Sequence, residues 1–150
     1  MFKDSNYSIA FINSKDVCVV RHPVLREGKP MESCVFDGDN LENTYHLGLF
    51  VDEKLIAVAS FMDNAHFMFD EKNQYQLRGM AVLKPYQGKN YGHIILKYGE
   101  DFLSAQGITS IWCNAREIAV PFYQKNNYVI IGDPFIIPEI GIHYVMQKKL

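Results

Sequence analysis

The sequence has no excess of basic residues, because its 15 Lys and Arg side chains are outnumbered by 17 Asp and Glu. Proteins that bind nucleic acid mainly through its phosphates carry a basic stripe. The one basic pair that stands out here is Lys148-Lys149, at the end of the chain. With a formal net charge of −2 at pH 7, the chain is therefore expected to have no nucleic-acid partner.

Long apolar runs and paired cysteines are also missing. No apolar run approaches the roughly 18 residues that a membrane helix needs, and Met1–Asn6 lacks the basic-then-apolar order of a secretory signal. The three cysteines, Cys18, Cys34 and Cys113, are odd in number and form no CxxC pair. No His/Cys cluster has the spacing of a zinc site. We therefore expect reduced thiols, no metal, no membrane partner and a cytoplasmic location.

Apolar periodicity predicts one α/β domain that spans residues 1–150 around a mixed sheet. With 48% hydrophobic residues the chain can build a sizeable core. Pro23 should kink or end the first helix, and residues 26–40 form a loop that is long for a compact domain. Strands are expected at residues 8–12, 46–51, 55–62, 76–83, 108–114, 128–131 and 142–147, and helices at residues 15–26, 89–106 and 118–125.

The segment after the central strand is a candidate anion site. Strand Leu77–Val82 runs into the polar stretch Pro85–Gly92, which opens a long amphipathic helix. The unpaired N–H groups of a helix's first turn and the helix dipole both favour negative charge there. This pattern alone does not distinguish a phosphate site from a tight strand-to-helix turn.

Three types of phosphate-binding loop can be compared with this segment. A Walker A loop requires Ser or Thr after Gly-Lys, but Gly88-Lys89 is followed by Asn90. A dinucleotide fingerprint requires GxGxxG and an acidic residue about 20 positions later, and no such residue ends the next strand. The remaining pattern, Gln/Arg-x-x-Gly-x-Gly/Ala from Gln87 to Gly92, resembles the pyrophosphate loop of the GNAT acyltransferases.

The resemblance extends to other parts of the chain. Residues 80–82 match the strand before the family's loop, and residues 114–128 resemble its A-x-x-F-Y-x-K-x-G-F stretch. The chain is similar to small bacterial-type N-acetyltransferases of this superfamily. The resemblance implies a mixed, mostly antiparallel sheet of six to seven strands with a splayed parallel pair. It also implies acetyl-CoA as co-substrate and direct acyl transfer to a small-molecule amine or a protein amino group.

The resemblance further implies which residues contact the coenzyme. Residues 80–82 would pair with the pantetheine arm through their main chain, and the loop amides would hold the pyrophosphate. Asn90 stands where the family usually has glycine, although Asn tolerates the left-handed region better than other residues. Arg116 replaces a frequent Asn. The implied contacts are Met80, Ala81, Val82, Gln87, Gly88, Lys89, Asn90, Tyr91, Gly92, Asn114 and Arg116.

Tyr123 falls on the family tyrosine that points at the coenzyme sulfur, which implies a general acid. A phenol with a pKa of about 10 is protonated at neutral pH. Pro121 is tolerated only in a helix's first turn, so the helix is expected to begin near Glu117, about two turns before Tyr123.

The base and the acceptor contacts are less specified. His143 on the last strand is the tentative base or acceptor contact, and His46 on an early strand is a tentative acceptor contact. His46, Glu139, Asp63 and a water molecule remain alternatives for the base. Arg21, His22 and Arg26 occupy the region that walls the acceptor site in the family, where Arg21 and Arg26 could bind an anionic acceptor or lie on a solvated helix face.

Two other functions remain open. One is a non-catalytic acyl-CoA-binding or sensor module, in which Asn90 and Arg116 mark a loss of turnover. The other is a scaffold that binds partners through residues 26–40. A homodimer is also compatible with the sequence, because the exposed edges of a small mixed sheet often pair.

Overall fold

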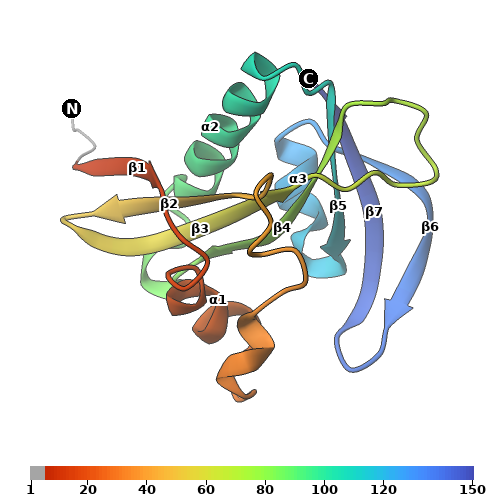
Figure 1. The fold of residues 1–150 in the computed structure, drawn as a ribbon. Coiled ribbons are helices and arrows are strands. Elements are labelled where there is room, and N and C mark those ends of the chain that lie inside the picture. Colours follow the sequence, from red (N-terminus) through yellow and green to blue (C-terminus); the bar gives the residue numbers. More distant parts are fainter. Residues whose placement is uncertain (1–5) are drawn as a thin grey trace.

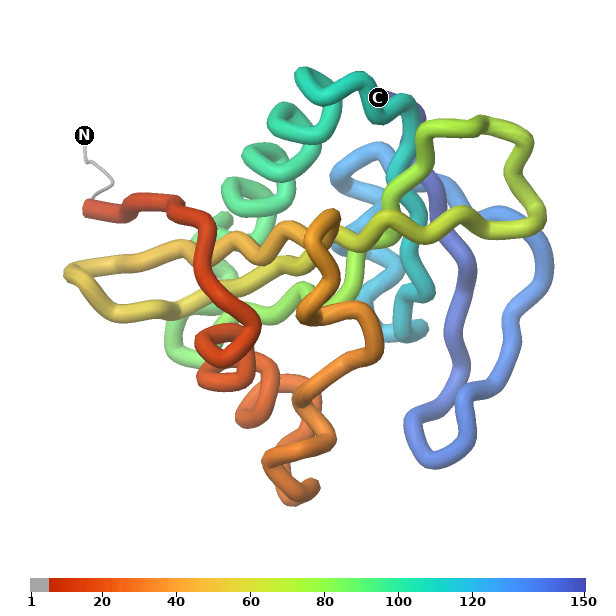
Figure 2. Tube along the Cα trace, viewed as in Figure 1, coloured from red at the N-terminus to blue at the C-terminus, as the bar shows by residue number. Residues whose placement is uncertain are grey.

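A seven-stranded sheet forms the centre of residues 6–150, the part of the chain that the computed structural model describes (Figures 1 and 2). The secretory-signal prediction rests on Met1–Asn6, of which residues 1–5 lie outside that part. The elements, with η for a 3-10 helix, are β1 (Tyr7–Phe11), α1 (Cys18–Leu25), η1 (Met31–Cys34), β2 (Tyr45–Val51), β3 (Lys54–Met62), β4 (Gln74–Val82), η2 (Lys84–Tyr86), α2 (Tyr91–Ala105), β5 (Ser110–Arg116), η3 (Glu117–Ala119), α3 (Val120–Lys125), β6 (Val129–Ile137) and β7 (Gly141–Lys149).

The strand order is β1-β2-β3-β4-β5-β7-β6, and every neighbouring pair except β4 and β5 is antiparallel. The β2–β3 hairpin turns at Asp52 and Glu53, whose φ angles are 50° and 67°. Positive φ at both central residues is typical of the type I′ turn, which matches the twist of the strands. The mixed, mostly antiparallel sheet is confirmed, and dimerisation through its edges stays a prediction.

Helices cover both faces of the sheet. Figure 1 shows α1 and α2 on opposite sides of it, and Figure 2 shows the chain from α1 through η1 to β2 as one long excursion on the α1 side. Val17 and Val20 pack with Ala81 in a small core beneath α1. A larger core on the other face joins Ile95 of α2 to Tyr123 of α3. We call these the α1 face and the α2/α3 face.

The parallel pair β4 and β5 separates along its length. The two strands pair at three positions, Gln74 with Ser110, Tyr75 with Ile111 and Gln76 with Trp112. Beyond them β4 continues to Val82 and β5 to Arg116 without further pairing between the two. The splayed parallel pair that the resemblance implied is therefore present, and backbone N–H and C=O groups line its opening.

A β-bulge in β4 lies at the edge of this opening. Ser60 of β3 pairs with Arg78 and Val58 pairs with Ala81, so Gly79 and Met80 together oppose one residue. Gly79 has φ +67°, and a Cβ added there would lie 2.7 Å from Arg21 Nε. The bulge thus requires glycine both for its backbone conformation and for the close approach of the arginine.

Some elements differ from the predicted ranges. α1 ends at Leu25, two residues after Pro23, and the loop 26–40 contains one 3-10 turn, η1. β6 continues to Ile137, beyond the predicted end at residue 131, because a register shift between Ile131 and Phe135 absorbs the turn-like Gly-Asp-Pro sequence. Among the helices of residues 6–150, none combines the length and apolarity that a membrane crossing requires.

Candidate active site

A cavity of about 280 Å³ occupies the opening between β4 and β5. Strand alternation assigns its walls to the two faces of the sheet. Cys113 and Ala115 belong to the core of the α2/α3 face, so Arg116 projects to the α1 face. His143 of β7 lies opposite Arg116 in the antiparallel register and therefore shares the α1 face. The cavity is thus lined from both sides of the sheet.

Tyr123 lines the cavity from the α2/α3 face. Its side chain packs against the rings of Phe122 and Tyr128, with centroid distances of 5.1 Å and 5.5 Å, and the residue is 7% exposed. Burial, and then the neighbouring Cys113, raise the pKa of Tyr123 well above its usual value. The phenol is therefore held neutral, as a proton donor must be.

The helix that carries Tyr123 begins later than predicted. Residues Glu117–Ala119 form the 3-10 turn η3, and α3 starts at Val120 with Pro121 in its first turn. Tyr123 therefore lies at the start of α3 and not two α-helical turns into a helix. Pro121 still lies in the first turn of α3, where a backbone N–H has no partner within the helix, so its lack of an N–H costs no hydrogen bond.

His143 lines the cavity from the α1 face. Its Nδ1 lies 2.8 Å from the carbonyl oxygen of Gly141. Since a carbonyl only accepts hydrogen bonds, Nδ1 carries the hydrogen of the neutral ring and Nε2 carries the lone pair. This tautomer makes Nε2 the nitrogen that can accept a proton.

The predicted coenzyme loop forms a left-handed entry into α2. Gln87 Nε2 donates to the carbonyl oxygen of Val82 at 2.8 Å, which fixes the start of the loop to the end of β4. Gly88 and Asn90 have φ angles of +79° and +74°. Asn90 is the N-cap of α2, so the expectation that it tolerates the left-handed region is confirmed.

Gly92 lies in the first turn of α2, where it packs against α3. A Cβ added at Gly92 would come within 3.1 Å of the Phe122 ring and 3.5 Å of Met80 Cε. The next residue, His93, contacts Asn126 Oδ1 through Nδ1 at 2.5 Å, which joins the same two helices. His93 therefore packs near the loop, while Lys89 is exposed.

Arg21 and His46, both predicted as acceptor contacts, are not among the residues that line the cavity. Arg21 is 0% exposed and forms a bidentate ion pair with Asp39, at 2.8 Å and 3.1 Å. It also donates to Ser60 Oγ at 2.9 Å. The apolar periodicity of α1 does not distinguish a buried, paired arginine from a solvated one.

His46 completes this buried network, outside the cavity that Tyr123 and His143 line. Its Nε2 donates to the carbonyl oxygen of Asp39 at 2.8 Å. Its Nδ1 then accepts from the hydroxyl of Ser60 at 2.6 Å. Both ring nitrogens are therefore engaged, and the network attaches the Asp39 loop to β2 and β3.

The remaining acceptor candidates divide between two places. Arg26 lines the cavity, whereas His22 contacts the carbonyl oxygen of Lys29 at 2.8 Å on the exposed loop. Glu139, with φ 69°, belongs to the β6–β7 turn.

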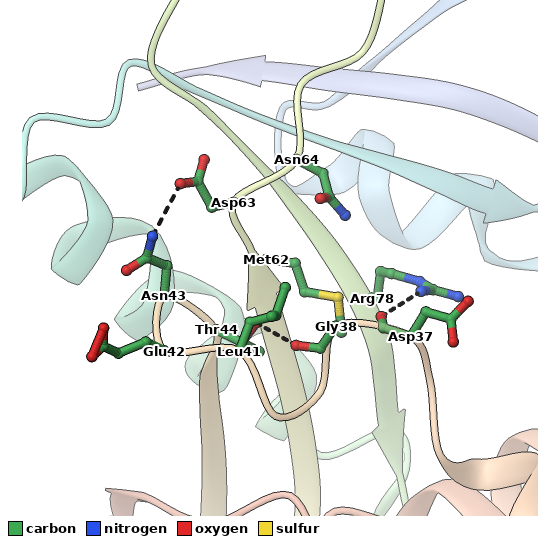
Figure 3. Close-up of a pocket in the computed structure, with 10 residues that line it drawn as sticks. All are labelled: Asp37, Gly38, Leu41, Glu42, Asn43, Thr44, Met62, Asp63, Asn64 and Arg78. Atoms are coloured by element: carbon green, nitrogen blue, oxygen red, sulfur yellow. Dashed lines mark hydrogen bonds between the residues drawn. The ribbon is translucent and has the colours of Figure 1, made fainter.

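Asp63 lines a second cavity of about 550 Å³, shown in Figure 3. Asp37, Glu42 and Asp63 give that cavity an acidic wall, and Arg78 lines both cavities.

Sequence reasoning missed two residues that shape the first cavity, Phe36 and Arg78. The position of Arg78 could have been inferred from the sequence. Arg78 comes two residues after Gln76 in the mainly apolar strand predicted at residues 76–83, and residues two apart in a strand lie on the same face. Phe36 gave no signal, because its position depends on the loop. The backbone N–H of Phe36 donates to Asp39 Oδ2 at 2.8 Å.

Cys113 lies at the base of the opening but is not prepared to act as a nucleophile. Burial raises its pKa far above the ordinary range of a thiol. A buried, protonated thiol is a poor nucleophile, since the thiolate is the reactive form. Within residues 6–150, no three His, Cys, Asp or Glu side chains are grouped so that they could hold a metal ion.

Comparisons with known proteins agree with this arrangement. The family model described as the acetyltransferase (GNAT) family matches residues 17–128. YitI of Bacillus subtilis (strain 168), described as an uncharacterized N-acetyltransferase, is 38% identical over 139 residues, which cover 93% of each chain.

Solved structures resemble the fold at low sequence identity. An aminoglycoside 6'-N-acetyltransferase complexed with coenzyme A has a TM-score of 0.76 at 13% identity, with 95% of this chain and 96% of that one covered. The PaiA N-acetyltransferase from Thermoplasma acidophilum, in complex with coenzyme A, has a TM-score of 0.69 at 17% identity, with coverage of 97% and 100%. The family match, the relative and the fold together lead to one assignment: the chain belongs to the acetyltransferase (GNAT) family and is an acyl-CoA-dependent N-acyltransferase.

Proposed function

We propose that the protein transfers the acetyl group of acetyl-CoA directly to a primary amine, with Tyr123 as the general acid. The observation that carries this proposal is the opening between β4 and β5, which holds the neutral Tyr123 phenol beside Met80 of β4, the strand that continues toward the loop before α2. A sensor without turnover would not need a buried phenol beside the position of the thioester.

The residues of the opening fit acetyl-CoA as co-substrate. Met80–Val82 do not pair with β5, so the edge of β4 that faces β5 can bind the pantetheine arm as a further strand would, by main-chain hydrogen bonds. The left-handed loop Gln87–Gly92 and the first turn of α2 offer N–H groups to the pyrophosphate. Two structures with this fold, the aminoglycoside 6'-N-acetyltransferase and PaiA, are complexes with coenzyme A.

Three groups of this chain then support the transfer. Backbone N–H groups near the bulge at Met80 polarise the thioester carbonyl. His143 Nε2, directly or through a water molecule, takes a proton from the amine as its nitrogen bonds to the acyl carbon. The carbon–sulfur bond breaks, and Tyr123 donates its proton to the leaving thiolate. The products are the amide and free coenzyme A.

Calorimetric titration with acetyl-CoA tests the first half of the proposal, and NAD serves as a ligand that has a pyrophosphate but no pantetheine. Gly88→Asp places a negative charge in the loop, and Gly107→Asp is its matched control. Both glycines have positive φ and open space around an added Cβ, and Gly107 lies beyond the other end of α2. Saturable binding of acetyl-CoA, lost in Gly88→Asp but kept in Gly107→Asp, is the expected result.

Thiol release in the presence of an amine panel tests the second half. We expect acetyl-CoA consumption that depends on an amine and falls in Tyr123→Phe while binding is kept. Binding without turnover for any amine would favour the sensor alternative. No binding at millimolar acetyl-CoA would contradict both.

A further inference from the structure

All four arginines of the chain gather at one place, around the ring of Phe36 and the end of α1. The guanidinium carbons of Arg21, Arg78 and Arg26 lie 4.0 Å, 4.6 Å and 5.2 Å from the centroid of that ring. Arg116 joins them from β5, where its Nη2 donates to the carbonyl oxygen of Leu25 at 3.2 Å. Arginines up to 95 positions apart in the sequence thus form one cationic cluster in the folded chain.

Among residues 6–150, Arg21 is the one arginine of the four that has a carboxylate partner. Arg21 pairs with Asp39, whereas the other three donate to carbonyl oxygens. Arg26 donates to Ser33 and Leu25, Arg78 to Asp37 at 3.5 Å, and Arg116 to Leu25. Within residues 6–150, no carboxylate lies within 4.0 Å of the guanidinium nitrogens of these three.

The positive charges also lie in a half-buried wall where they repel one another. Burial, and then Arg21, lower the pKa of Arg78, and burial followed by Arg26 lowers the pKa of Arg116. Unpaired charge at such a site is unfavourable for folding. A negatively charged ligand group would relieve this repulsion, and planar guanidinium groups bind carboxylate and phosphate in a bidentate manner.

The cluster lies on the side of the cavity away from Tyr123. Arg26, Arg78 and Arg116 line the cavity together with His143, and Arg116 and His143 face each other in the register of β5 and β7. The loop before α2, where we place the pyrophosphate, is a different segment, which follows the end of β4. The unpaired arginines are therefore next to the group that would deprotonate the amine.

We propose that the acceptor is a small amine that carries an anionic group, a carboxylate or a phosphate, which Arg26, Arg78 and Arg116 bind while the amine lies toward His143. This inference rests on the proposed function and names the substrate class of the same site. The acidic cavity of Figure 3 would favour a cationic acceptor, but Tyr123 and His143 line the other cavity, and Arg78 is the one residue that the two share.

Matched acceptor pairs test the proposal without any mutation. β-Alanine is compared with β-alaninamide, phosphoethanolamine with ethanolamine, and putrescine serves as the cationic amine. A charge-assisted bidentate contact predicts kcat/KM about 10- to 100-fold higher for the anionic member of at least one pair. The pair that responds distinguishes carboxylate from phosphate. Equal rates within both pairs, or putrescine as the best acceptor, would overturn the proposal.

Arginine variants test the cluster itself. Arg78→Gln and Arg116→Gln are compared with Lys72→Gln, which removes the same charge from an exposed residue outside both cavities. We expect KM for the anionic acceptor to rise about 10- to 100-fold in the arginine variants, with the neutral acceptor and Lys72→Gln unchanged. Melting temperatures show whether each variant is folded, and the acceptor pairs remain decisive if one is not.

Binding measurements separate this inference from the proposed function. If the arginine variants weaken acetyl-CoA binding as much as acceptor use, the cluster serves the coenzyme and the inference is wrong. If no amine is acetylated, titration of β-alanine and phosphoethanolamine into the protein with coenzyme A still reports on the cluster. Anion binding that Arg78→Gln abolishes would support the cluster while the proposed function fails, and no binding would contradict both.

Discussion

Tyr123 and His143 line the same cavity from opposite faces of the sheet, Tyr123 from the α2/α3 face and His143 from the α1 face. Such an arrangement is possible because β4 and β5 stop pairing after Gln76 and Trp112, which opens the sheet between them. A proton donor and a proton acceptor can then act on the two sides of one reacting carbon. The coenzyme and the amine would approach from different faces and meet at the bulge of β4.

Replacing Tyr123 by Phe should lower turnover and leave acetyl-CoA binding nearly unchanged. The phenyl ring keeps the packing against Phe122 and Tyr128, so only the proton donor is lost. General acid catalysis is worth about 10²- to 10⁴-fold, so kcat should fall by about 10²-fold or more. Steady-state kinetics measure kcat, and calorimetry measures binding. A variant with wild-type kcat would exclude Tyr123 as the acid.

The sequence predicted the sheet well because its signals are local. The apolar runs at residues 46–51 and 55–62 predicted the two strands of the β2–β3 hairpin, and the helix predicted at residues 89–106 matches α2, whose C-cap is Gln106. The left-handed Asn90 was also predictable, since only the steric tolerance of one residue decides it. The resemblance supplied the splayed pair, which no periodicity in β4 or β5 indicates.

The acceptor side could not be predicted to the same extent. Arg21 and Arg26 are five positions apart on and after one helix, yet one is buried against Asp39 and the other lines the cavity. Their roles depend on how the loop from Arg26 to Asp39 folds back, which is a matter of tertiary packing. Arg78 joins them only because the bulge at Gly79 keeps it on the α1 face.

His143→Asn should remove the nitrogen that accepts a proton while it keeps the hydrogen bond to Gly141. The Asn amide can donate to the carbonyl of Gly141 as Nδ1 does, but it offers no nitrogen that accepts a proton. We therefore expect a fold and an acceptor KM close to those of the wild type, with kcat lowered about 10²-fold. If kcat of the variant matches that of the wild type, a water molecule or another group is the base.

Asn90→Val should destabilise the coenzyme loop, whereas Asn90→Gly should not. Asn90 has φ +74° and no side-chain capping hydrogen bond, so its conformation is what matters. A β-branched residue in this region costs about 1–2 kcal/mol, which lowers Tm by roughly 2–8 °C in a chain of this size. Calorimetric scanning measures Tm, and weaker acetyl-CoA binding should accompany the loss. A stable Asn90→Val variant would show that the loop can adopt another conformation.

Asp39→Asn should be among the most destabilising single changes in the chain. It leaves the fully buried Arg21 without its charge partner, and breaking a buried pair in this way costs about 3–5 kcal/mol. Asp101→Asn, which removes the exposed Lys97–Asp101 pair, is the control and should leave stability nearly unchanged. Urea unfolding of the two variants gives the comparison. A loss no larger than that of the control would mean that Phe36, Ser60 and the carbonyl of Cys34 are enough to stabilise Arg21.

Stability should fall at high pH, and Tyr128 should account for part of the fall. Burial, and then the Glu100 carboxylate that accepts its hydrogen bond at 2.9 Å, raise the pKa of Tyr128 well above 10. The unfolded chain therefore releases this proton near pH 10 while the folded chain still holds it. The contribution is fully present below about pH 10 and is lost as the pH rises toward the higher folded value.

Tyr128→Phe should reduce this dependence, because the variant has no proton to release at that position. At pH 7 it should be less stable than the wild type, since Glu100 loses a donor and keeps only Lys148, at 2.8 Å. Between pH 9 and 11 the difference between the two proteins should narrow. Urea unfolding free energies at pH 7, 9, 10 and 11 measure both effects. Parallel curves for the two proteins would mean that Tyr128 ionises as readily when folded as when unfolded.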